Sequence, residues 1–191
     1  THGGTHFYAG KVLELLDYKL YKWPGHGLAD DAVMVQFDEQ EYMRPDEYDE
    51  FIGNPTDFII RRFLPRTWGV FSPMSTLAPL SSFQGIAYQA LGMASIPDFQ
   101  PMFKAISEAS RALDEWQSVV SECSQATQAM GYPSTEGGMA LAPFDTITDL
   151  LRGTRGSSLD MYRQPDKLLE ATEKMVKAQE AGNFTEAKKF A

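Results

Sequence analysis

The sequence predicts a helix-rich α/β protein with a few short strands, and three observations lead to this expectation. The chain has 191 residues, 43% of them hydrophobic and 12% aromatic, which is enough to bury a core in a single unit. Apolar residues recur at helical spacing in several segments. Short β-leaning runs are few and are bounded by turn residues such as Pro24-Gly25-His26-Gly27.

The first third of the chain is expected to alternate helices and short strands. The expected helices are 5–17, 46–51 and 56–63, and the expected strands are 18–23 and 32–37. Residues 67–97 then contain no charged side chain at all. Prolines and glycines interrupt this stretch, which excludes a membrane-spanning helix. We expect short buried helices at 74–80 and 83–91, forming a covered core layer or, alternatively, an apolar interface.

A single long helix is the strongest secondary-structure prediction. Its apolar residues alternate in steps of four and three: Met102, Ile106, Ala109, Leu113, Trp116, Val120, Cys123, Thr127 and Met130. This spacing predicts a helix near 99–130, about 48 Å long at 1.5 Å per residue, packed along most of its length. Gly131 and Pro133 are expected to end it.

The last third is expected to contain one strand and several helices. The expected strand is 138–142, and the expected helices are 146–151, 165–181 with Gly182 as the end, and a short final helix from Asn183.

Composition excludes several classes of function. The chain carries 17 basic and 26 acidic side chains, a formal charge of −9, and no run of lysine or arginine. Nucleic acid and anionic membrane are therefore not expected as partners. Cys123 is the single cysteine, so no intramolecular disulfide can form, which indicates the cytoplasm.

Few residues suggest chemistry. His2 and His6 have the spacing of a metal-binding pair on a helix, but no third ligand is near them, and no metal site is expected. His26 lies in a turn and is either a turn residue or an acid–base group. Asp38 and Glu39 follow a predicted strand directly, where α/β enzymes carry reacting groups.

These two carboxylates belong to an acidic run that is ordinarily a solvated surface. The run comprises Asp38, Glu39, Glu41, Asp46, Glu47, Asp49 and Glu50.

Four segments carry a resemblance to a known family. They are Ala142-Pro143-Phe144-Asp145 and its continuation to Gly153, the run Asp160–Leu169, and the upstream runs 35–43 and 46–52. Together they resemble the uroporphyrinogen decarboxylase superfamily, in particular its methyltransferase-like branch. The match covers the N-terminal half of that family, so the chain is expected to be a fragment, residues 1–191 forming one unit.

The resemblance implies a partial (β/α)8 barrel, dominated by helices, with the loop carrying Phe144 and Asp145 at its mouth. It also implies either decarboxylation of porphyrinogen acetates or methyl transfer to and from a corrinoid. The arginine-rich substrate motif of the decarboxylases is missing. Asp145 and Asp149 would repel a polyanionic porphyrinogen, which favours methyl transfer.

We therefore predict part of a corrinoid-linked methyltransferase, inactive as this chain alone. Asp38 and Asp145 are the candidate catalytic residues, and His26, Glu39 and Phe144 the candidate substrate-binding residues. No cofactor is expected in this chain, whereas zinc or a corrinoid protein is implied for the full-length enzyme. A half barrel would expose sheet edges, so self-association or binding of the missing C-terminal half is expected.

The alternative is a non-catalytic helical interaction domain, whose long helix binds a partner helix through the residues 102–130.

Overall fold

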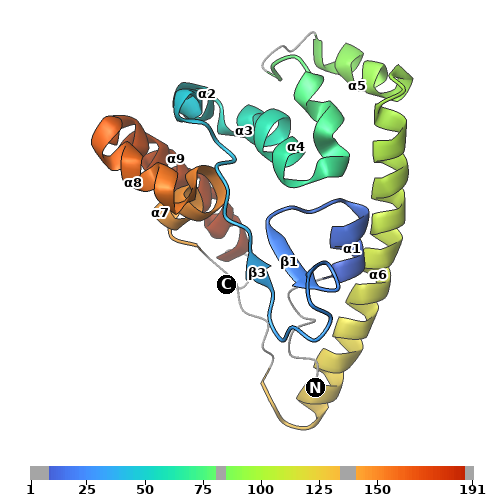
Figure 1. Ribbon diagram of the computed structural model, residues 1–191. Coiled ribbons are helices and arrows are strands. Elements are labelled where there is room, and N and C mark those ends of the chain that lie inside the picture. Colours follow the sequence, from blue (N-terminus) through green and yellow to red (C-terminus); the bar gives the residue numbers. More distant parts are fainter. Residues whose placement is uncertain (1–8, 81–84, 134–140, 188–191) are drawn as a thin grey trace.

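The computed structural model describes residues 9–80, 85–133 and 141–187, and helices dominate them (Figure 1). The first half contains α1 (Gly10–Leu15), β1 (Tyr21–Pro24), β2 (Gly27–Leu28), β3 (Gln36–Phe37), η1 (Pro45–Glu47), α2 (Tyr48–Gly53), α3 (Pro55–Phe58), η2 (Ile59–Phe63), α4 (Leu64–Thr67) and η3 (Gly69–Thr76). The second half contains α5 (Gly85–Ser95), α6 (Phe99–Ala129), α7 (Pro143–Asp145), η4 (Thr146–Arg152), α8 (Gly153–Arg163) and α9 (Pro165–Ala187). The segments η1 and η3 are 3-10 helices, whereas η2 and η4 are π-helical.

The expectation of a partial (β/α)8 barrel is wrong. In the described residues the strands form one small sheet in the order β2-β1-β3, with β1 parallel to β2 and antiparallel to β3. A barrel needs parallel strands separated by helices, but here the three strands follow one another without a helix between them. Of the strand expected at 138–142, residues 138–140 lie outside the described residues, and 141–142 are not in a strand.

The turn between β1 and β2 depends on glycine. Gly25 and Gly27 have φ angles of 76° and 82°, a region that residues with a Cβ rarely adopt. The Trp23 and His26 rings stack across the turn with centroids 4.1 Å apart. The turn therefore lies where the sequence predicts it, although the strands on either side are shorter than expected.

The long helix is confirmed, since α6 spans Phe99–Ala129 and runs along one side of the molecule (Figure 1). It ends as predicted at Gly131, whose φ angle is 86°. The Gly131 N–H donates to the Gln128 carbonyl and the Tyr132 N–H to the Thr127 carbonyl, the two bonds of a Schellman motif. Elements α1, η3 and α5 pack against this helix.

The uncharged stretch is not the buried layer that its composition predicts. Its first part forms η3, which has no buried residue. In α5 the side chains of Tyr88 and Leu91 are 78% and 68% exposed. No helix of the described residues is long and apolar enough to cross a bilayer.

The C-terminal helices agree with the prediction except at α8, which the sequence analysis did not predict, and at Gly182. The expected helix at 146–151 is the π-helical η4, and the helix from Pro165 is α9. Gly182 does not end α9, which continues to Ala187, so the separate last helix is wrong.

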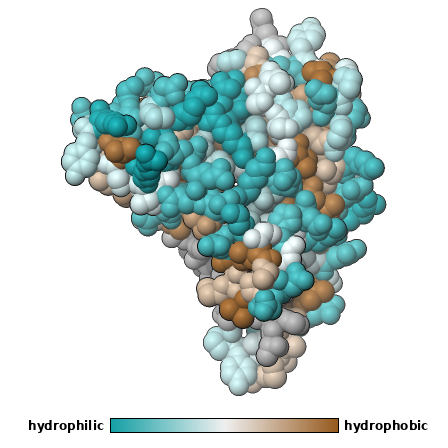
Figure 2. Space-filling view, viewed as in Figure 1, coloured by the Kyte–Doolittle hydropathy of each residue, from teal (hydrophilic) through white to brown (hydrophobic). Residues whose placement is uncertain are grey.

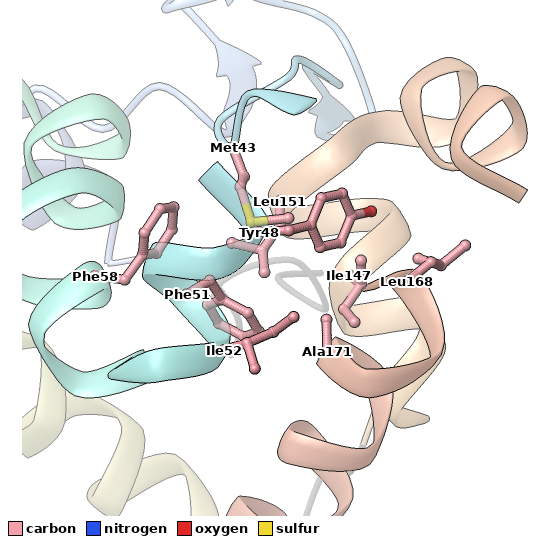
Figure 3. Close-up of a cluster of buried hydrophobic side chains, with 9 residues drawn as sticks. All are labelled: Met43, Tyr48, Phe51, Ile52, Phe58, Ile147, Leu151, Leu168 and Ala171. Carbon is pink, nitrogen blue, oxygen red and sulfur yellow. The ribbon is translucent and has the colours of Figure 1, made fainter. Parts of the chain in front are cut away.

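The main core lies where α2 and α3 meet η4 and α9 (Figure 3). Its buried members are Met43, Tyr48, Phe51, Ile52, Phe58, Ile147, Leu151, Leu168 and Ala171. The Phe51 and Phe58 rings meet edge to face, with centroids 5.5 Å apart. The core therefore joins segments that are about a hundred residues apart in the sequence.

Truncation of this core should be costly. Ile147 is fully buried, and Ile147→Ala is expected to lower the free energy of unfolding by about 2–5 kcal/mol, because it leaves a cavity. Leu91→Ala, at an exposed position, is the control and should change it by less than about 0.5 kcal/mol. Urea unfolding followed by circular dichroism measures both, and equal effects would contradict this description of the core.

Candidate functional site

Residues 38–44 form an irregular strap between β3 and η1, and two arginines hold it. Arg66 Nη1 donates to the Tyr42 carbonyl at 2.6 Å, and Arg152 Nη1 donates to the Met43 carbonyl. A strap without strand partners has unsatisfied backbone carbonyls, and the guanidinium groups satisfy two of them.

Arg152 is the centre of a buried cluster. Its side chain is 2% exposed, and Nε donates to Asp160 Oδ2 at 2.6 Å. Its Nη1 also binds Glu41 Oε2 at 3.0 Å. The Tyr48 hydroxyl donates to Asp160 Oδ2 at 3.0 Å. The cluster thus links the strap and α2 to α8, more than a hundred residues later in the chain.

Asp160 and Tyr48 are each held in one protonation state. Burial alone would raise the pKa of Asp160, but hydrogen bonds from Arg152, Gln164 and Tyr48 bring it below its ordinary value. Burial and the hydrogen bond to Asp160 raise the pKa of Tyr48. At neutral pH Asp160 is therefore ionised and Tyr48 protonated, an arrangement that fixes structure rather than moves protons.

A second buried pair anchors residues 77–80, within the uncharged stretch. Arg61 donates to Asp57 through Nε at 2.9 Å and Nη2 at 2.6 Å, and its Nη1 donates to the Leu77 carbonyl at 3.2 Å. Asp57 Oδ1 in turn accepts the Leu80 N–H at 2.7 Å. Hydrogen bonds from Arg61 bring the pKa of Asp57 below its ordinary value.

The acidic run is only partly a solvated surface. Glu47 is 3% exposed and binds Arg66 through both carboxylate oxygens, each at 2.7 Å. Its Oε2 also accepts the Arg44 N–H at 2.8 Å. Burial would raise the pKa of Glu47, but the bonds from Arg66 and Arg44 lower it overall. Asp46, by contrast, is exposed.

The side chain of Glu39, from the strap, contacts the N-terminus of α8. The Thr154 N–H donates to its Oε1, which places a carboxylate at the N-terminus of that helix, where the dipole favours it. A Cβ added to Gly153, whose φ angle is 67°, would lie 3.2 Å from the same oxygen. The geometry therefore gives Glu39 a positioning contact.

Asp38 and His26 lie on the small sheet. Asp38 Oδ1 accepts a hydrogen bond from Lys22 at 3.1 Å, and Oδ2 accepts one from Gln40 at 3.3 Å. His26 is exposed and stacked on Trp23.

Phe144 and Asp145 lie on α7. Phe144 is half-buried against the main core, whereas Asp145 is exposed. Among the described residues, no hydrogen bond or ion pair joins any two of the five candidates His26, Asp38, Glu39, Phe144 and Asp145.

The described residues do not supply a metal centre. They contain no group of three or more His, Cys, Asp or Glu side chains that could hold an ion. His2 and His6 lie outside the described residues. Cys123 is exposed on α6. The donor set therefore does not fit the thiol-binding zinc that the family resemblance implies.

Sequence reasoning missed the three arginines that organise this region. The available signal is local, since Arg61 follows Ile59-Ile60 and Arg152 follows Leu150-Leu151, and a cation within an apolar run requires an internal partner. The partners of Arg152 are too far along the chain for any local pattern to identify them.

No protein-family model, curated protein or solved structure matches the chain.

The buried carboxylates predict acid lability. The folded-state pKa values of Glu47, Asp57 and Asp160 lie below their ordinary values of 4.5, 3.8 and 3.8. The stabilisation is therefore present above those ordinary values and is lost as pH falls below them. Urea unfolding between pH 7 and pH 3 should show this decline.

Asp160→Asn tests the contribution of the Arg152 cluster. It leaves Arg152 without its buried anion and should cost about 3 kcal/mol at pH 7. The variant should also lose less stability on acidification than the parent. Asp114→Asn, at an exposed position on α6, is the control, and an equal effect there would contradict the assignment.

Two helical glycines should respond oppositely to alanine. In Gly156→Ala the new Cβ would lie 3.0 Å from Arg152 Nη2 and 3.4 Å from Glu41 Cδ, whereas Gly92→Ala meets nothing within 4 Å. Gly92→Ala should stabilise the protein by about 0.5–1 kcal/mol. Gly156→Ala should lack this gain or destabilise, because it pushes against a buried ion pair. Thermal unfolding compares them, and equal stabilisation would show that the cluster is not tightly packed.

Proposed function

We propose that this chain is part of an enzyme similar to the uroporphyrinogen decarboxylase superfamily, of the branch that transfers methyl groups to and from a corrinoid. The proposal concerns activity alone, and no barrel is part of it. The alternative is a helical interaction domain, and that function would not require contact between the strap and α8.

One observation carries the proposal: the segments that bear the resemblance pack against each other. Residues 38–49 meet residues 152–167 through six polar contacts. They are Glu39–Thr154, Glu41–Arg152, Met43–Arg152, Tyr48–Asp160, Pro45–Gln164 and Asp49–Lys167. A site assembled from two distant segments requires such an arrangement, and buried charges make it rigid.

Among the candidate residues, the exposed side chains are the ones available to a substrate. We assign Asp145 or Asp38 the role of polarising or protonating the substrate, because each carboxylate is at least partly exposed. Phe144 provides an apolar wall, and His26 and Glu39 line the site. The contact of Glu39 with α8 makes its role one of positioning.

The substrate class follows from charge. Asp145 and Asp149 are both exposed on consecutive turns, and a polyanionic porphyrinogen would be repelled there. A methyl group on a neutral donor, or a corrinoid held by a partner protein, meets no such repulsion. We place the enzyme in the cytoplasm, and no step is assigned to a zinc ion.

The test is the rate of methyl transfer from methylcobalamin to an added thiol, which gives the methyl thioether and cob(I)alamin and is followed by visible absorption, in the full-length protein. Asp145→Ala is expected to lower turnover by about a hundredfold or more, the usual contribution of an acid–base group. Its thermal midpoint should stay unchanged, because Asp145 is exposed.

Asp114→Ala removes an exposed carboxylate from α6 and should leave turnover unchanged. Parental turnover in Asp145→Ala would remove Asp145 from the mechanism. Parental turnover in both Asp145→Ala and Asp38→Ala would overturn the proposed use of these carboxylates.

A further inference from the structure

The second half of α6 carries an exposed apolar stripe. It consists of Val119, Cys123, Ala126 and Met130, all of them exposed, with Val119 at 59% and Met130 at 68%. Their spacing of four, three and four is that of a helix that packs on another helix. The first half of the helix differs, because Met102 and Ala109 are buried there. In the second half Trp116, Val120 and Thr127 continue the line of these buried residues and are half-buried, so the stripe is a separate, exposed face of the helix.

The position of α6 leaves this stripe open to a partner. The helix forms one side of the molecule over its full length (Figure 1). The space-filling view shows brown, apolar surface among the teal residues along this side (Figure 2).

Charge indicates which partner fits. Between residues 116 and 133 the only charged side chain is Glu122, although the whole chain has a net charge of −9. A basic or acidic partner would find almost no charge to bind on this surface. Two copies of this acidic chain would repel each other over most of their surface. This repulsion is smallest at the stripe, where charged side chains are few.

We propose that a second copy of this chain docks on the stripe, α6 against α6, in a symmetric dimer. Such an interface is self-complementary, because each copy presents the same residues. The stripe covers 12 residues, about 18 Å of helix, which is short for an interface of standard size. The dimer should therefore be weak and reversible. This inference does not depend on the proposed enzymatic function.

Cys123 provides the probe, since it is the only thiol of the chain and lies near the middle of the stripe. In either helix orientation it is covered when two copies pair. The first measurement is sedimentation velocity over a concentration series under reducing conditions. The second is the rate of Cys123 alkylation by a maleimide, which should fall as the dimer forms.

Matched variants separate the stripe from general surface effects. Val119→Glu places a charge in the interface and should weaken dimerisation by about tenfold or more in Kd. It should leave the fold intact, because Val119 is exposed. Val33→Glu makes the same change at a valine that is 94% exposed on another part of the surface, and it should leave dimerisation and alkylation as in the parent.

Three results would overturn the proposal. The parent chain could be monomeric at all concentrations, leaving the stripe to the helix of a different protein. A dimer could be unaffected by Val119→Glu. Val119→Glu and Val33→Glu could weaken association equally, which would indicate repulsion by charge anywhere on the surface.

Discussion

Arg152 brings a positive charge into the interior, where an unpaired cation would cost several kcal/mol, and the surrounding chain is arranged to satisfy it. Asp160 neutralises it from α8, one helix further along. Glu41 and the Met43 carbonyl reach it from the strap, more than a hundred residues earlier. The main core is also built from residues 43–58 and residues 147–171. Apolar packing and ion pairing therefore join the same two parts of the chain. Loss of Asp160 would leave the charge buried and open this junction.

The same geometry recurs at the other two internal arginines. Arg61, Arg66 and Arg152 each give Nε or Nη2 to a carboxylate and Nη1 to a backbone carbonyl. The carbonyls belong to Leu77, Tyr42 and Met43, all in segments without regular secondary structure. Such carbonyls have no ladder partner, and a buried one would be unsatisfied. Arginine suits this arrangement because its planar guanidinium group can donate to a carboxylate and still has an N–H left to donate to a carbonyl. The three arginines therefore tie these irregular segments to the helices beside them.

Local patterns could predict the elements but not how they assemble. The regular apolar spacing of α6 and the glycine at its end are short-range signals, and both hold in the structure. The barrel was wrong because it came from family resemblance, whereas the strands at 21–37 are joined by turns that leave no room for helices. The absence of charge in residues 67–97 predicts burial, because charges are rare in cores. An uncharged segment need not be buried, however, and Tyr88 and Leu91 are exposed. Glu39 could be identified as a candidate from its place after a strand. Its partner Thr154 could not be, because no local rule links residues so far apart.

The molecule is stabilised in two different ways in its two parts. The part built from the strap, α2–α4, η4 and α8 contains the buried ion pairs, and its stability depends on carboxylates that protonate in acid. Helix α6 contributes to none of these pairs, and the ion pair on it, Lys104–Glu108, is exposed. It depends on packing against α1, η3 and α5, and on the Schellman motif at its C-terminal end. Acid therefore acts on the first part directly and on α6 only through its neighbours. A surface on the second half of α6 can thus change its contacts without disturbing the charges that hold the strap.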